Sequence, residues 1–302
     1  MGRYLVRRIF LSLFSIFGLI TATFFLLRCL PGGPFDDEVQ LAPQVLAALK
    51  IQYGLDQSLL TQYTLYLKNL AEFNLGHSIL YSGKSVSIVI MNALPRSFGL
   101  GAGALFFGVL IGISSGFLFF ITGSQVVMRA IHFMFLSAPT LFLGPLVILV
   151  FGLWLNWFPI TVSDRWASYI LPLMVLTIRP AANLARLLIG GLEESLAQPW
   201  AITAKAYGFS NEKILMKFAF KQSLIPVLSY LGQSVAGILS GSLLVEIIFN
   251  IGGLGSQFIE SLVNRDYAVI ISLTLIYGLI LVISNLLFDI IIYSLDARIE
   301  KN

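Results

Sequence analysis

The sequence predicts an all-α polytopic membrane protein with six transmembrane helices, and three observations support that fold class. First, 57% of the 302 residues are hydrophobic and only 11% are charged, with a mean hydropathy of +0.88. Such a composition excludes an ordinary soluble domain, in which about 25% of residues are charged. Second, apolar runs of the ~20 residues that a bilayer span needs recur along the chain. Third, the basic residues that separate these runs follow a one-sided pattern.

The first expected span follows three arginines and is read as a retained membrane anchor. It superficially resembles a signal peptide, but the run is long and no small-residue cleavage site follows it. Five further spans follow it along the chain. The six expected spans are 9–29, 97–121, 131–154, 168–189, 223–247 and 268–292.

Glycines recur at four-residue intervals in the second and fifth spans, as Gly108, Gly112 and Gly116 and as Gly237 and Gly241. Small residues at this spacing let helix backbones approach closely, which drives helix association in lipid. The pattern fits either packing within one subunit or a specific dimer face, and we favour packing within the subunit.

The basic residues predict an orientation with both termini in the cytoplasm. The opposite side then carries only Arg165 and Arg265 in its two short loops. An excess of lysine and arginine in cytoplasmic segments is the usual pattern of multi-pass proteins. The residues on the cytoplasmic side are Arg3, Arg7, Arg8, Arg129, Lys205, Lys213, Lys217, Lys221, Arg298 and Lys301.

Three regions are expected along the chain. Residues 1–30 form the cytoplasmic N-terminus and first span, and residues 31–96 form an external, mostly helical segment. That segment opens with "PGGP" and an acidic cluster, and helical periodicity follows at Val45–Ile51 and Leu59–Leu70. Residues 97–302 form a core with five spans, including a polar loop at 190–222.

The polar loop contains "QPWAITAKAYGFSNEKILMK", which predicts two short helices. Pro199 can start the first helix without losing a hydrogen bond, and Gly208 can end it in the left-handed conformation. Ser210 can cap the second helix, whose lysines recur at four-residue steps opposite an apolar face. We expect a protruding knob, then an interfacial helix that bends into the fifth span near Pro226. The pattern fits an ordinary connection or a docking surface for a cytoplasmic partner, and we favour docking.

The same segment resembles the cytoplasmic loop of ABC importer permeases of the oligopeptide/dipeptide/nickel family. Similarity extends over the whole chain, through "YLVRRIF", "LRCLPGGP", "YGLDQSLLTQY", "NLGHSI", "VEIIFNIGGLG", "NRDYA" and "LDARI". The long outer loop resembles that of the first of the two paired permease subunits. The residues of the polar loop that fall in register are Thr203, Ala204, Lys205, Ala206, Gly208, Ala219, Leu224, Ile225 and Pro226.

The resemblance implies the type I ABC importer permease architecture, with the first helix of the loop acting as a cytoplasmic coupling helix. The residues implied in coupling are Thr203, Ala204, Lys205, Ala206 and Gly208. The implied partners are a second homologous permease subunit, two ABC ATPase subunits, an external substrate-binding protein, membrane lipid and a peptide substrate, with no nucleic acid. The implied location is the bacterial inner membrane.

Four residues depart from the family pattern. Phe218 stands where histidine is usual and Gln222 where asparagine is usual, while Gly252 and Ala297 replace prolines. None of these changes removes the knob or its glycine, so the implied coupling role is unaffected.

Two charged residues in the expected spans are candidates for the translocation pathway. Arg179 lies within the fourth span, where an arginine is costly and usually faces water, a partner or the protein interior. It fits a peptide carboxylate or pore position, or a structural ion pair. Glu246 lies near the outer end of the fifth span, before "IIFNIGGLG", where the resemblance implies a re-entrant or gate-like segment.

Enzyme functions are not supported by the sequence. "LYSGKS" ends like a phosphate-binding loop, but Ser78 occupies the position of its first glycine. His77 and His132 are the only histidines, no G-x-S-x-G accompanies them, and no cluster of ligands suggests a metal or cofactor. We therefore expect a permease rather than an enzyme, with ATP hydrolysed by separate subunits. The alternatives are a permease for nickel or another small solute, or a secondary transporter that works without an ATPase.

Overall fold

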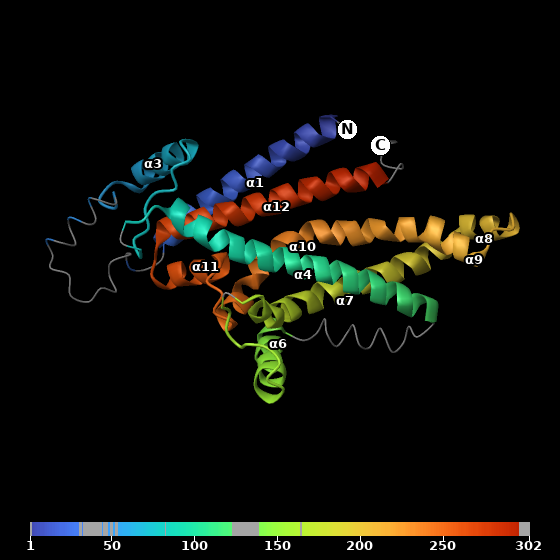
Figure 1. The fold of residues 1–302 in the computed structure, drawn as a ribbon. Helices are drawn as coiled ribbons and strands as arrows, with labels where there is room; N and C mark the ends of the chain where they lie inside the picture. The colour runs from blue at the N-terminus through green and yellow to red at the C-terminus, as the bar shows by residue number, and fades with distance from the viewer. Residues whose placement is uncertain are drawn as a thin grey trace. The chain divides into compact units, whose positions relative to one another are not determined.

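The computed structural model describes residues 2–29, 32, 44, 48, 51, 54–81, 83–122, 139–163 and 165–295. Every regular element among these residues is a helix, apart from one isolated bridge between His77 and Ser85 (Figure 1). The principal helices are α1 (Gly2–Cys29), α3 (Leu59–Ala71), α4 (Val86–Thr122), α6 (Thr140–Val147), α7 (Ile170–Leu196), α8 (Pro199–Ala206), α9 (Asn211–Lys213), α10 (Phe220–Ile248), α11 (Leu254–Val263) and α12 (Tyr267–Leu295).

Helices long and apolar enough to cross a membrane correspond to five of the six expected spans. Those found in the described residues are Arg7–Cys29, Val86–Thr122, Trp166–Leu196, Asn211–Val235 and Tyr267–Ile292. The third expected span, 131–154, begins outside the described residues. Its described part is a shorter apolar helix, Thr140–Trp154, whose second half, Ile148–Trp154, is π-helical. The acidic cluster, most of Val45–Ile51, Arg129 and the basic C-terminal residues also lie outside the described residues.

Helix α4 begins at Val86, well before the expected start of the second span at residue 97. The sequence suggested a boundary there because the charge-free run begins only after Arg96. In the structure the helix continues through Pro95, although proline removes a backbone hydrogen bond. Val86 and Ile90 are buried in this first part of the helix, and such apolar burial offsets the cost of the proline.

The chain divides into two compact units. One unit comprises Met1–Pro95 with Ser256–Leu279, and the other comprises Arg96–Gly255 with Ile280–Asn302. The first unit contains α3, which packs on α1 through a ring contact between Tyr63 and Phe24, with centroids 5.1 Å apart. It also buries Asp266, whose Oδ2 accepts hydrogen bonds from the Ser78 hydroxyl and from two backbone N–H groups.

The second unit is built on α7 and α10, which lie side by side (Figure 1). Fully buried leucines of α7 contact an apolar face of α10, and together they form a core beneath the polar loop. The residues of this core are Leu184, Leu188, Leu192, Ala219, Val227 and Leu231. Trp200 of α8 packs against this core, which therefore supports the knob predicted from the sequence.

The glycines of α4 pack against α7 within this unit. A Cβ atom at Gly112 would lie 2.7 Å from the carbonyl oxygen of Ala181, and one at Gly116 would lie 3.0 Å from the Cα of Ala185. Only residues without a side chain permit such an approach, so the interpretation as packing within one subunit is supported for these glycines. Gly237 on α10 differs, because a Cβ there would meet nothing within 4 Å.

Candidate functional site

The knob is helix α8, which has the predicted start and stop signals. Pro199 occupies its first turn after Gln198, whose backbone is extended. At its end, Gly208 N–H donates to the Lys205 carbonyl over 2.9 Å and Phe209 N–H donates to the Ala204 carbonyl over 3.2 Å. Gly208 has φ +81°, so these paired bonds form a Schellman motif of the kind that favours glycine.

One face of α8 is exposed, and it includes most of the residues expected to take part in coupling. Ala201 is buried, whereas Thr203, Lys205 and Ala206 are exposed and Ala204 is half-buried. Two large apolar side chains stand beside them: Ile202 is 70% exposed and Tyr207 is 80% exposed. A short helix that presents apolar side chains next to small residues is suited to close contact with another protein.

Aromatic contacts attach the knob to the helix that follows. The ring of Phe218 lies 6.1 Å from that of Trp200 and 5.9 Å from that of Phe209, with the second pair edge to face. The Nζ atom of Lys213 lies 4.7 Å from the centre of the Phe209 ring. Phe218, one of the departures from the family pattern, is therefore the central ring of an aromatic clamp formed by Trp200, Phe209 and Phe218.

No helix end separates the expected interfacial helix from the fifth span at Pro226, the position where a bend was expected. Ser210 caps the helix as predicted, since its hydroxyl accepts from Lys213 N–H over 3.3 Å. The chain then remains helical through a π-helical turn, Ile214–Ala219, and through α10, with Pro226 inside the helix. The bond that Pro226 cannot make is tolerated because the flanking Val227 is buried against α7.

The start of α10 at the base of the knob is joined to α7 by close packing and by a side-chain hydrogen bond. The Ser195 hydroxyl on α7 donates to Gln222 Oε1 on α10 over 2.8 Å. Gln222, which also departs from the family pattern, therefore links the two helices. A Cβ atom at Gly191 would lie 2.9 Å from the Cβ of Ser223. The end of α7 and the start of α10, which flank α8 in the sequence, are therefore held together.

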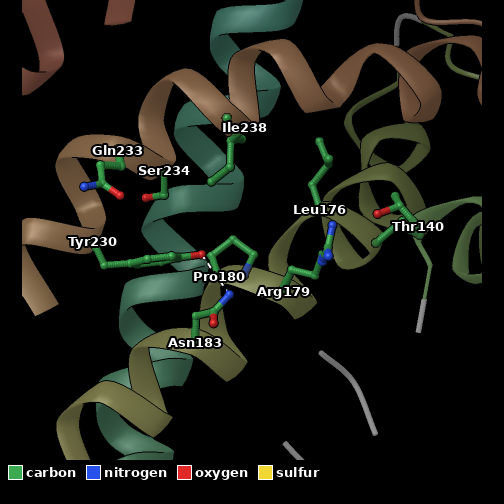
Figure 2. A pocket seen from close by; sticks show the side chains of 11 residues that line it. Thr140, Leu176, Arg179, Pro180, Asn183, Tyr230, Gln233, Ser234 and Ile238 are labelled. Atoms are coloured by element: carbon green, nitrogen blue, oxygen red, sulfur yellow. Dashed lines mark hydrogen bonds between the residues drawn. The ribbon is translucent and has the colours of Figure 1, made fainter. Parts of the chain in front are cut away.

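A pocket of about 300 Å³ lies between α7 and α10, and Arg179 is one of its lining residues (Figure 2). Its polar lining consists of Thr140, Arg179, Asn183, Tyr230, Gln233 and Ser234. Asn183 Nδ2 donates to the Tyr230 hydroxyl over 3.1 Å, which connects the two helices across the pocket. The side chain of Arg179 is exposed, so it can meet a molecule that enters.

Sequence reasoning missed the residues that line the pocket beside Arg179, although α7 carried a signal for some of them. Arg179, Asn183 and Arg186 recur at helical spacing and all lie on the less buried face of α7. Tyr230 and Gln233 complete the pocket from α10. These residues of α10 lie about 50 positions along the chain from those of α7. No local sequence pattern therefore indicates that the two sets come together.

Glu246 does not line this pocket and is fully buried elsewhere in the same unit. Its Oε1 accepts from the Ser97 hydroxyl over 2.6 Å, and its Oε2 accepts from Gly255 N–H over 2.8 Å. The Ser97 hydroxyl in turn accepts from Leu254 N–H over 2.7 Å. The carboxylate therefore secures the turn between α10 and α11, and the structure does not bring it together with Arg179.

A family model matches residues 108–301, and its description is binding-protein-dependent transport system inner membrane component. The oligopeptide transport system permease protein OppB of Haemophilus influenzae is 34% identical over 308 residues, covering 99% of this chain and 100% of that protein. The dipeptide transport system permease protein DppB of Lactococcus lactis is 34% identical over 309 residues, with the same coverage.

Among solved structures, the inward-facing MetNI methionine ABC transporter has a chain with the same fold. The TM-score is 0.57 at 16% identity, and the match covers 70% of this chain and 97% of that chain. Together with the helical spans, this likeness confirms the predicted type I ABC importer permease fold.

Proposed function

The chain belongs to the family of binding-protein-dependent transport system inner membrane components, and from this premise we propose that it forms half of a peptide pathway in an ATP-driven importer. It is a multi-pass inner-membrane permease of the ABC importer class. Such permeases are not enzymes themselves, and they work with an ATPase and a substrate-binding protein. The finer assembly that we propose pairs this chain with a second homologous permease, two ATPase subunits and an external binding protein.

The names of the relatives support peptide as the substrate. One relative is an oligopeptide permease and another a dipeptide permease, and both align with this chain over nearly its whole length. A permease for nickel or for another small solute is the alternative within the same class. The mixed polar and apolar lining of the pocket at Arg179 favours an organic solute over a bare metal ion.

The observation that carries the coupling role is the exposed, rigidly ended helix α8. In this proposal the ATPase binds the face of Thr203, Ala204, Lys205 and Ala206, and Gly208 ends the helix so that this face stays accessible. ATP-driven closure of the two ATPase subunits then pulls on α8, and the aromatic clamp passes that movement to α10. The spans rock between outward-open and inward-open states, which is alternating access by near-rigid motion.

This arrangement requires α8 to face the cytoplasm, and we propose that both termini do so as well. Lys205, Lys213, Lys217 and Lys221 near α8 support this orientation, because lysines concentrate on the cytoplasmic side. Residues 31–96 would then face the binding protein on the outer side. Labelling of a cysteine introduced at exposed Tyr207 in a Cys29→Ser background, from one side of the membrane only, tests the orientation.

The whole proposal is tested by reconstituting the chain with its cognate subunits in liposomes. We expect uptake of a labelled tripeptide that requires both ATP and the binding protein. Uptake of Ni²⁺ but not of peptide would support the alternative solute. Uptake driven by an ion gradient without an ATPase would contradict the importer function, and failure of the ATPase to copurify with the chain would count against coupling through α8.

A further inference from the structure

The pocket between α7 and α10 has an excess of hydrogen-bond donors. Arg179 is its one charged lining residue, and no aspartate or glutamate is among the described residues that line it. Arg179 forms no hydrogen bond or ion pair with any residue that the structure describes, and its side chain is exposed. An arginine within a span is costly unless water or an anion meets it, so this side chain is available to a negatively charged group.

Two hydrogen bonds in series orient Tyr230 so that its hydroxyl is a second donor in the pocket. Arg186 Nη2 donates to Asn183 Oδ1 over 3.4 Å, so the amide group of Asn183 directs its nitrogen to Tyr230. Asn183 Nδ2 donates to the Tyr230 oxygen over 3.1 Å, which occupies that oxygen as an acceptor. The phenolic proton of Tyr230 has no acceptor among the described residues and is left for a ligand. Arg186 and Asn183 are thus positioning residues.

Figure 2 shows how these groups are arranged. Tyr230 extends from α10 toward Asn183 on α7, and Arg179 lies one helical turn from Asn183 on the same helix. Both Arg179 and Arg186 are close enough to Tyr230 to interact with it electrostatically. The Ser234 hydroxyl donates to the Leu231 carbonyl, so it adds no further donor to the pocket.

We infer that this pocket binds a carboxylate group of the transported peptide, through the Arg179 guanidinium and the Tyr230 hydroxyl. The inference rests on the proposed function and deepens it. A carboxylate accepts from two or more donors at once, and its charge-assisted bonds to an arginine are roughly twice as strong as bonds between neutral groups. The pocket volume of about 300 Å³ is at the lower end for ligand sites, so it suits one end of a peptide. Every unmodified peptide carries such a group at its C-terminus.

The test compares two forms of one labelled tripeptide with uncharged side chains, one with a free C-terminus and one amidated. Uptake of both is measured in liposomes that contain the full transporter and its binding protein, and the ratio of free to amidated uptake is taken. Preference of the binding protein itself cancels when this ratio is compared between variants. We expect Arg179→Gln to lower the ratio about tenfold or more, because a bond to a charged group is lost.

Three further variants make the result specific. Arg179→Lys keeps the charge, and its ratio of free to amidated uptake is expected to stay close to that of the wild type. Tyr230→Phe is expected to lower this ratio about threefold to tenfold. Lys221→Gln removes the same charge from α10 outside the pocket and is expected to leave the ratio at the wild-type value.

Equal ratios in wild type and Arg179→Gln would overturn the inference. If Arg179→Gln does not assemble, Tyr230→Phe decides, and a wild-type ratio in that variant would overturn it. ATP-dependent uptake by the wild type with no change in ratio would leave the proposed function intact. No uptake of either form by the wild type would instead contradict the proposed function.

Discussion

The hydroxyl of Ser97 donates to Glu246 Oε1 over 2.6 Å and thereby joins α4 to the end of α10. Both side chains are fully buried, and Glu246 also accepts from Gly255 N–H at the start of α11. A Cβ at neighbouring Gly253 would contact both Ser97 Oγ and Glu246. The turn after α10 is thus built closely around one carboxylate.

Removal of this carboxylate should destabilise the second unit. In Glu246→Ala the Ser97 hydroxyl and Gly255 N–H lose their acceptor while remaining buried, at a cost of about 2–4 kcal/mol. Thermal unfolding of the purified permease in lipid nanodiscs should show a clear decrease in Tm. Glu194→Gln alters an exposed glutamate and should leave Tm unchanged. Equal Tm values for both variants would contradict a structural role for Glu246.

Substitution of Gly112 tests the packing of α4 on α7. A Cβ there would lie 2.7 Å from the Ala181 carbonyl oxygen, and backbone atoms cannot move aside cheaply. Gly112→Ala should therefore lower stability by about 1–3 kcal/mol. Gly99, on the same helix, has nothing within 4 Å of its ideal Cβ, so Gly99→Ala should be neutral or slightly stabilising. Denaturation of the two variants in parallel measures the difference, and similar stabilities would contradict this packing.

The aromatic clamp predicts a defect in coupling without a defect in folding. Phe218→Ala removes ring contacts to Trp200 and Phe209, each worth about 0.5–1.5 kcal/mol beyond its burial. We expect membrane insertion to be retained and the ATPase to dissociate more readily, as measured by copurification. Met216→Ala, at an exposed position on the same helix, should copurify like the wild type. Normal retention of the ATPase by Phe218→Ala would show that the clamp does not hold α8.

Local features of the site were predictable from the sequence because short-range chemistry determines them. Pro199, Gly208 and Ser210 act on backbone groups within a few residues, and the structure shows each in its predicted position. The ends of α4 and α10 were not predictable from such short-range signals. The charge-free run after Arg96 suggested that α4 starts at residue 97, and Pro226 suggested a bend. Burial of neighbouring residues instead keeps Pro95 and Pro226 inside helices.

The pocket shows a different limit of sequence reasoning. Arg179 was recognisable as an unusual charge within a span, but the residues of α10 that line the pocket with it were not. Asn183 and Tyr230 meet only because α7 and α10 pack together, and the tightness of that packing depends on Gly191 and on the core leucines. Glu246 was likewise recognisable as a charge near the outer end of the fifth span, whereas its partner Ser97 lies 149 residues away.

The first unit offers a prediction on pH. Burial raises the pKa of Tyr66 on α3 to about 12, and the nearby Tyr63 adds to this rise. Its hydroxyl has no hydrogen-bond partner among the described residues. The unfolded chain loses this proton near pH 10.0, whereas the folded chain holds it to about pH 12. Stability from this group is therefore complete below pH 10 and is lost as pH rises through 12.

Tyr66→Phe isolates that contribution. The variant lacks the titrating hydroxyl, so its stability should fall less steeply between pH 10 and pH 12 than that of the wild type. Chemical denaturation at a series of pH values measures the slope. Identical slopes would show that Tyr66 titrates normally in the folded protein.

Gly208 is the most direct test of coupling through α8. Its φ of +81° costs an L-residue about 1–2 kcal/mol, while the space around an added Cβ is open. Any effect of substitution therefore comes from backbone strain rather than from steric collision. Gly208→Val should distort the end of α8, so that ATP is still hydrolysed while peptide uptake falls severalfold. Gly208→Asn is the matched control, because asparagine tolerates the left-handed region, and it should retain most coupling. The measurement is peptide transported per ATP hydrolysed in liposomes. A wild-type ratio in Gly208→Val would show that the geometry of this helix end does not transmit ATPase movement to the spans.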